Sequence, residues 1–177
     1  EPWVFDMDTT VKPLYGHQQD AKVGYNPTKP GRPSHAYHSY FVANIRMVLD
    51  MEVQAGNQTA PLFAQPGLWS FLDGLTERDR PIFLRGDSHW GAEKAMVGAE
   101  ERKLGFLFKL KQSVNVKKLI GQIFTKEEWE EAGQQWQGRK EVLRLEGWSQ
   151  ERQVVVLRRP LQNKPAAEAV AAGKKKR

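Results

Sequence analysis

Two aspartates near the start of the chain have a spacing that suits metal-dependent chemistry. Residues 3–11 alternate apolar and polar side chains, a pattern typical of a half-buried β-strand. On such a strand Asp6, Asp8 and Thr10 share one face, and the apolar side chains of the other face can pack on a core. Like charges at adjacent positions repel each other, and a divalent cation is the usual reason for a strand to keep them. The alternative is that one aspartate is solvated while the other caps a neighbouring loop.

A further aspartate lies in a similar setting much later in the chain. Residues 81–88 form a short apolar run that ends in Gly86-Asp87 and leads into a predicted helix. Open α/β sheets bind ligands at the carboxyl ends of such buried strands. Two aspartates on different strands supply the oxygen ligands that Mg²⁺ prefers, so the sequence predicts a metal site.

The composition places the chain among single-domain, cysteine-free proteins. Its 177 residues correspond to about one domain, and the 40% hydrophobic content is enough for a core. The sequence contains no apolar run of membrane-spanning length and no signal peptide. The absence of cysteine excludes disulfides and thiolate metal sites and favours a cytoplasmic setting.

The basic charge favours an anionic partner such as nucleic acid. The net charge is +6, from 27 Lys+Arg and 21 Asp+Glu. Six basic residues form two C-terminal clusters, so the alternative is that much of this excess belongs to a solvated tail. The start at Glu1 and the Lys-Lys-Lys-Arg end lead us to expect a piece of a longer protein.

The remaining pattern predicts alternating strands and helices. Residues 12–38 are rich in proline and glycine and are expected to form a loop, in which Lys29 and Arg32 project from a rigid, extended backbone. Such an arm suits a nucleic-acid backbone, whereas the alternative is a surface loop with incidental charge. Residues 37–45 and 47–54 predict a hairpin, with a helix over 36–48 as the alternative. Helices are expected over 62–78 and 92–103, and a strand over 105–111.

The composition changes beyond residue 112. A short helix is predicted over 116–124, and the capping-box spacing of residues 125–128 predicts the start of another. Strands are expected over 140–146 and 153–159, and residues 160–177 are expected to be a linker or a truncated helix. No zinc-ligand spacing relates His35, His38 and His89.

Three motifs together resemble a known family. They are Asp-Met-Asp-Thr-Thr-Val-Lys-Pro (residues 6–13), Gly-Tyr-Asn-Pro-Thr-Lys-Pro-Gly-Arg-Pro-Ser (24–34) and Leu-Arg-Gly-Asp-Ser (84–88). In this order they resemble the DDE transposases of bacterial insertion sequences, and among them group thirteen-eighty of the insertion-sequence-four superfamily. The resemblance implies an α/β, ribonuclease-H-like mixed sheet with flanking helices and a β-rich insertion.

The resemblance also implies roles for the acidic residues. Asp8 and Asp87 would be the catalytic, metal-binding carboxylates, Asp6 would be a neighbour, and Thr9 or Thr10 would orient Asp8. The third acidic residue of the family is a glutamate in a late helix, and its sequence pattern does not occur here. Residues 1–111 would be the first part of the core, 112–160 the insertion and 161–177 a linker or truncated helix. The chain is therefore expected to be incomplete and inactive alone.

The implied reaction is phosphoryl transfer at the double-stranded ends of an insertion sequence, with two Mg²⁺ or Mn²⁺ ions. Lys29, Arg32 and Arg85 would contact phosphates. The protein would assemble as a homodimer on DNA in the bacterial cytoplasm, in association with the nucleoid and not with a membrane. Two other functions stay open: a non-catalytic DNA-binding remnant of a decayed transposase, and a structure-specific nuclease of the same fold.

Three tryptophans of the insertion are further candidates for DNA contacts. Trp129, Trp136 and Trp148 could stack on an unpaired base, as related transposases hold a flipped base with a tryptophan of this region. The alternative is ordinary aromatic packing within the insertion.

Overall fold

The computed structural model describes residues 2–26 and 28–160 of the chain. It divides the chain into two compact units, Glu1–Val116 and Lys117–Arg177. The tail predicted over 161–177 lies outside the described residues. Among the described residues, no helix is both long and apolar enough to cross a membrane.

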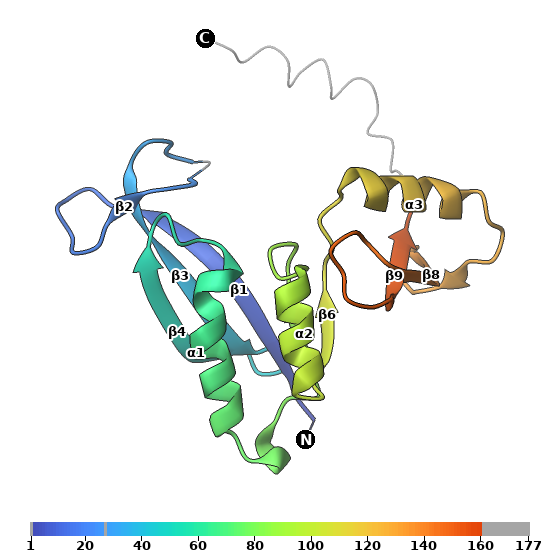
Figure 1. Ribbon diagram of the computed structural model, residues 1–177, viewed down its shortest axis with the longest axis horizontal. Coiled ribbons are helices and arrows are strands. Elements are labelled where there is room, and N and C mark those ends of the chain that lie inside the picture. The colour runs from blue at the N-terminus through green and yellow to red at the C-terminus, as the bar shows by residue number, and fades with distance from the viewer. Residues whose placement is uncertain (1, 27, 161–177) are drawn as a thin grey trace, which may run out of the picture. The chain divides into compact units, whose positions relative to one another are not determined.

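The first unit is built on a mixed sheet (Figure 1). Its strands are β1 (Val4–Pro13), β2 (Lys22–Val23), β3 (Pro33–Val42), β4 (Met47–Ala55), β5 (Phe83–Gly86) and β6 (Gly105–Phe108). The order across the sheet is β3-β1-β5-β6, and both β4 and the short β2 pair with β3. Strands β1, β3 and β4 are antiparallel neighbours, whereas β5 and β6 run parallel to β1. The predicted α/β class with a mixed sheet is therefore confirmed.

Two helices cover one face of this sheet. They are α1 (Pro61–Gly74) and α2 (Glu93–Glu101), and a short 3-10 helix, η1 (Glu77–Asp79), follows α1. The alternation of β1 turns Phe5 toward the helices, where its ring lies 5.8 Å from that of Phe71 in α1. The core between sheet and helices is made of buried side chains from both: Phe5, Met7, Tyr40, Leu84, Leu68, Leu72, Ala95 and Met96. This packing leaves the polar side of β1 on the opposite face.

The hairpin of β3 and β4 is confirmed, and the alternative helix over 36–48 is wrong. The turn between the strands contains no glycine, because Arg46 itself adopts a left-handed conformation with a φ of 54°. The loop predicted over 12–38 is shorter than expected. Strand β1 continues to Pro13, and β3 begins at Pro33, where the first position of a strand tolerates the missing N–H.

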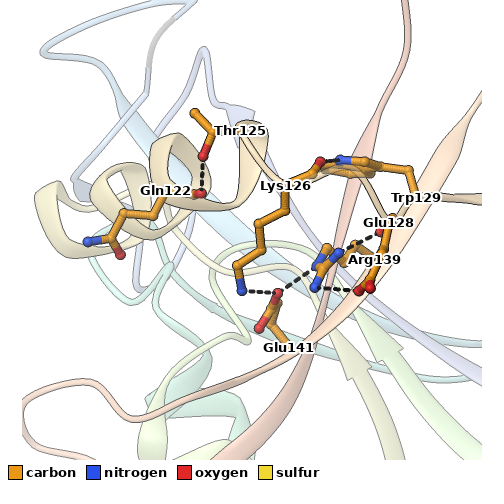
Figure 2. Close-up of polar contacts among 7 residues, drawn as sticks. All are labelled: Gln122, Thr125, Lys126, Glu128, Trp129, Arg139 and Glu141. Carbon is orange, nitrogen blue, oxygen red and sulfur yellow. Dashed lines mark hydrogen bonds and ion pairs between the residues drawn. The ribbon is translucent and has the colours of Figure 1, made fainter.

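The second unit contains a small antiparallel sheet. Helix α3 (Val114–Phe124) leads into it, and the strands β7 (Glu130–Glu131), β8 (Gln137–Leu143) and β9 (Arg152–Arg158) lie in the order β7-β8-β9. The helix predicted to start at the capping box of residues 125–128 is wrong. The Thr125 hydroxyl donates to the Gln122 carbonyl in the last turn of α3, so it does not cap a following helix (Figure 2).

Candidate active site

The parallel pairing of β1 with β5 brings two of the sequence-predicted aspartates to neighbouring strands. The register ends with Met7 opposite Gly86; Asp8 is the next residue of β1, and Asp87 is the first residue after β5. Side chains two residues apart on a strand share a face, so Asp8 lies on the face of Asp6. Both aspartates therefore come directly after the last paired residue of their segment, at the same end of the pairing between β1 and β5.

Asp6 is bound by Arg85, its register partner on β5. The Arg85 Nε and Nη2 groups donate to the two carboxylate oxygens of Asp6, each at 2.5 Å. These hydrogen bonds raise the pKa of Arg85 above its ordinary value. Asp6 is therefore neutralised by a bidentate pair, while the Arg85 side chain stays 51% exposed. Arg85 was predicted to contact phosphate, and its remaining N–H groups lie outside this pair.

Asp8 differs from Asp6 in its surroundings. Its side chain is exposed and takes no hydrogen bond or ion pair from the part of the chain that the structure describes. Its backbone carbonyl accepts a 3.4 Å hydrogen bond from the Ser39 hydroxyl of β3. Thr10 shares the exposed face with Asp8. Asp8 is therefore a carboxylate open to a ligand.

The role predicted for Thr9 needs correction. Its hydroxyl lies 2.9 Å from Nδ1 of the buried His38, on the helix-covered face of the sheet. The other ring nitrogen of His38 is 3.0 Å from the Gln58 carbonyl. A carbonyl only accepts, so Nε2 carries the proton and Nδ1 accepts from Thr9. Burial lowers the pKa of His38, which is consistent with this neutral ring. Thr9 thus fixes His38, and it does not orient Asp8.

Asp87 lies directly after β5 in a tight turn that holds its carboxylate. The backbone N–H of His89 donates to Oδ1 at 2.9 Å, and Nδ1 of His89 lies 3.2 Å from Oδ2. The Asp87 carbonyl accepts the N–H of Trp90 at 3.1 Å, which closes the turn. The Asp87 side chain is nevertheless 49% exposed. The contact from His89 was not predicted, although the position of His89 two residues after Asp87 was a signal for it.

The residues present fit a metal site in part. Carboxylate oxygens are hard ligands that suit Mg²⁺ or Mn²⁺, and Asp8 and Asp87 supply them. Asp87 has the basic residue His89 beside it, whereas no Lys or Arg of the described residues pairs with either carboxylate. Among the residues that the structure describes, no cluster of three or more His, Asp or Glu side chains could hold a metal ion. Within the described residues, Asp8 and Asp87 are therefore the two candidate ligands that the sequence predicted for such an ion.

Hydrogen bonds hold the residues around Lys29 and Arg32, between β2 and β3. The side-chain carbonyl of the buried Asn26 accepts the backbone N–H groups of Thr28 and Lys29, both at 3.1 Å. The Arg32 N–H donates to the Lys29 carbonyl at 3.3 Å and closes a turn in which Gly31 has a φ of 75°. This is the turn position that requires glycine.

Contacts at both ends of this loop restrict it further. A Cβ added to Gly24 would lie 2.0 Å from the Gly56 carbonyl oxygen, so the two backbones touch. The Arg32 guanidinium lies over the Tyr15 ring, 4.4 Å from its centre. Arg32 is thus held by its own contacts, and Lys29 is exposed beside them.

The three tryptophans of the second unit have different surroundings. Trp148 is 8% exposed and has the Arg152 guanidinium 5.2 Å from its ring, which favours the alternative of aromatic packing over base stacking. Its ring packs in the core of the unit. Trp129 is half-buried, with Arg158 3.9 Å from its ring, and Trp136 is half-buried with Arg159 at 4.8 Å.

A charged network fixes the segment around Trp129. Lys126 and Arg139 both donate to Oε1 of Glu141, at 2.9 and 2.6 Å, and Arg139 also reaches Glu128 (Figure 2). The hydrogen bonds from Arg139, and then from Lys126, lower the pKa of Glu141. The Trp129 indole N–H donates to the Lys126 carbonyl at 2.8 Å. This segment is therefore held by β8 without forming the predicted helix.

Comparison with known proteins identifies the family. The model of the family described as Transposase DDE domain group 1 matches residues 1–165, so the chain belongs to this family of DDE transposase domains. A search of curated proteins finds no match.

Among solved structures, the chain is similar to the piggyBac transposase in its synaptic complex with hairpin DNA. The similarity has 10% sequence identity and a TM-score of 0.45, and it covers 87% of this chain and 32% of that chain. The present chain thus spans about a third of the length of that transposase.

Proposed function

We propose that this chain is part of the catalytic core of a DNA transposase of insertion-sequence group thirteen-eighty. It would cut and join DNA strands by phosphoryl transfer at the ends of its element. The observation that supports the proposal is the parallel register of β1 and β5, which ends one residue before Asp8 and one residue before Asp87, while Arg85 neutralises Asp6. Membership of the DDE transposase family supports the same reaction class.

Asp8 and Asp87 would hold a Mg²⁺ or Mn²⁺ ion through their carboxylate oxygens. When bound, such ions activate an oxygen nucleophile and offset the charge that develops at phosphorus. The backbone N–H of His89 keeps one oxygen of Asp87 in a fixed position. Asp6 holds the Arg85 guanidinium on the same face, where its other N–H groups could bind a phosphate of the DNA.

Lys29 and Arg32 would bind the DNA backbone outside the carboxylate site. Between residues 9 and 49 the chain has five Lys or Arg residues and a single acidic residue, Asp20. Such a basic segment favours a polyanion, and its contribution to affinity should decrease as the salt concentration rises. The double-stranded DNA of the element ends is the proposed partner, with a homodimer as the assembled form.

The proposal includes an incomplete active site. We propose that the third carboxylate of the site lies outside the described residues, because no group of three or more possible ligands occurs among them. We propose residues 1–111 as the first part of the core and 112–160 as a β-rich insertion. The sheet of β7, β8 and β9 supports a β-rich insertion.

A titration with Mn²⁺, followed by NMR line broadening, tests the metal site. We expect broadening centred on Asp8 and Asp87 in the wild type and its loss in Asp8→Asn. Asp20→Asn is the matched control, because Asp20 has a left-handed φ of 57° that asparagine also tolerates. Diffuse broadening that is the same in all three proteins would refute the site.

A DNA-binding module without catalytic activity is the second candidate, and the same count of two carboxylates favours it. Incubation of the purified chain with DNA of the element ends and Mn²⁺ tests whether this chain contains a complete site. We expect binding without cleavage, for the wild type and for Asp87→Asn alike. Cleavage that Asp87→Asn abolishes would show a complete site within this chain, and cleavage without strand joining would favour a nuclease.

A further inference from the structure

The turn that carries Asp87 combines exposed and buried residues at short range. The side chains of Asp87 and His89 are 49% and 61% exposed, whereas the next residue, Trp90, is completely buried. The hydrogen bond from the Trp90 N–H to the Asp87 carbonyl links the buried residue to the exposed one. The orientation of Asp87 therefore depends on how Trp90 is packed.

The residue before Asp87 packs directly on this tryptophan. A Cβ added to Gly86 would lie 2.7 Å from both Cβ and Cγ of Trp90 and 2.8 Å from Cδ1. Real Cβ atoms do not approach other heavy atoms so closely, so only glycine lets the end of β5 lie against the ring. The last residue of β5 is thus fixed by Trp90.

The far end of the turn is also fixed. A Cβ added to Gly91 would lie 2.4 Å from the Lys109 carbonyl oxygen, and the Lys109 N–H donates to the Gly86 carbonyl at 3.1 Å. The backbone of residue 109 therefore contacts both glycines that flank the turn. Neither end of the turn can shift independently of the sheet.

Trp90 fixes the turn through the packing of its ring and not through a polar contact. Its buried indole N–H has no hydrogen-bond partner among the described residues, so a hydrogen bond of this group does not account for the position of the ring. The atoms that would meet a Cβ on Gly86 are Cβ, Cγ and Cδ1, and phenylalanine has atoms at the same three positions. A phenylalanine should therefore replace Trp90 in this contact, whereas a small aliphatic side chain should not.

We propose that Gly86 and Trp90 are positioning residues for Asp87. Their close packing fixes the turn in which the His89 N–H orients the Asp87 carboxylate, and so it presets this carboxylate for a divalent cation. The inference rests on the proposed function of Asp87 as a metal ligand. Partners that orient metal ligands typically change metal affinity by about 10–100-fold when they are altered.

The test uses four variants of the whole chain and two measurements. The first measurement is Mn²⁺ affinity from electron paramagnetic resonance of the free ion, and the second is the NMR shift and hydrogen exchange of the His89 amide without metal. We expect Gly86→Ala to weaken Mn²⁺ binding by about 10–100-fold and to increase exchange of the His89 amide. Gly74→Ala is the matched control, because a Cβ on Gly74 would meet nothing within 4 Å.

The variants of Trp90 keep the test decisive if Gly86→Ala fails to fold. Trp90→Phe should retain the wild-type affinity and the protected His89 amide, whereas Trp90→Val should lose both. Equal results for Trp90→Phe and Trp90→Val, or wild-type values for a folded Gly86→Ala, would overturn the inference. Absence of Mn²⁺ binding to the wild type, with His89 still responding to Gly86→Ala, would instead refute the proposed metal site and keep the positioning role.

Discussion

Neutralising Asp6 or Asp8, one at a time, should affect different properties: loss of Asp6 should mainly lower stability, and loss of Asp8 should mainly remove metal binding. The two carboxylates share a face of β1, but Asp6 receives two hydrogen bonds from Arg85 whereas Asp8 receives none from the described residues. Asp6→Asn therefore removes a bidentate ion pair. Asp8→Asn removes only a neighbouring like charge.

The structure sets the size of both effects. The side chains of the pair are 25% and 51% exposed, so solvent screening limits its contribution to about 1 kcal/mol, the upper end for surface pairs. Carboxylates two residues apart on a strand are separated by roughly 6.7 Å, and at a water-like dielectric constant they repel by about 0.6 kcal/mol. Asp6→Asn should thus lower the free energy of unfolding, and Asp8→Asn should leave it unchanged or raise it slightly.

The metal affinity should follow the opposite order. Asp8→Asn removes a candidate ligand and should abolish Mn²⁺ binding, while Asp6→Asn should only weaken it by removing a nearby negative charge. Hydrogen exchange of β1 amides reports the stability of this strand, and Mn²⁺ titration reports the site. A double-mutant cycle of Asp6→Asn with Arg85→Gln should give a coupling of about 1 kcal/mol. Loss of Mn²⁺ binding in Asp6→Asn without loss of stability would refute the reasoning and identify Asp6 as a ligand.

Three further outcomes follow from the structure. Burial lowers the pKa of His38 in the folded protein, so the unfolded chain binds a proton at this residue more strongly. The contribution of His38 to the free energy of unfolding should be complete above pH 6.5 and decrease as the pH falls below it. Unfolding curves of the wild type and of a His38→Gln variant at pH 7.5 and 5.5 would check this. Lys29→Ala and Arg32→Ala should each reduce the slope of log affinity against log salt by about one in DNA-binding titrations, and unchanged slopes would argue against phosphate contacts. Trp148→Ala should destabilise the second unit by about 3–5 kcal/mol, and loss of DNA affinity without unfolding of β8 and β9 would show that the ring contacts DNA instead.

Periodicity in the sequence was sufficient to predict the main elements of the first unit. The alternation around Asp6 and Asp8 identified β1, and helical spacing placed α1 and α2 to within a few residues. The hairpin of β3 and β4 was also predicted, although its turn lacks glycine. These elements follow from local pattern because one face of each packs on the core.

Predictions from local sequence were wrong where the hydrogen-bond partner of a side chain depends on the fold. Thr125 has the spacing of a helix cap, yet its hydroxyl bonds to the preceding turn of α3. Thr9 follows Asp8 in the chain but lies on the other face of the strand and bonds to His38. Neither partner is visible in the sequence, because each depends on how the chain folds back.

The sequence by itself determined which residues could form the site. The Asp6 and Asp8 pair, the Gly86-Asp87 strand end and the basic loop with Lys29 and Arg32 were all identified from residue type and spacing. Only the tertiary structure decided how these residues are arranged. The parallel register of β1 and β5 brings Asp8 and Asp87 to the same end of the pairing and places Arg85 opposite Asp6, and register is a property of two strands that no single segment encodes.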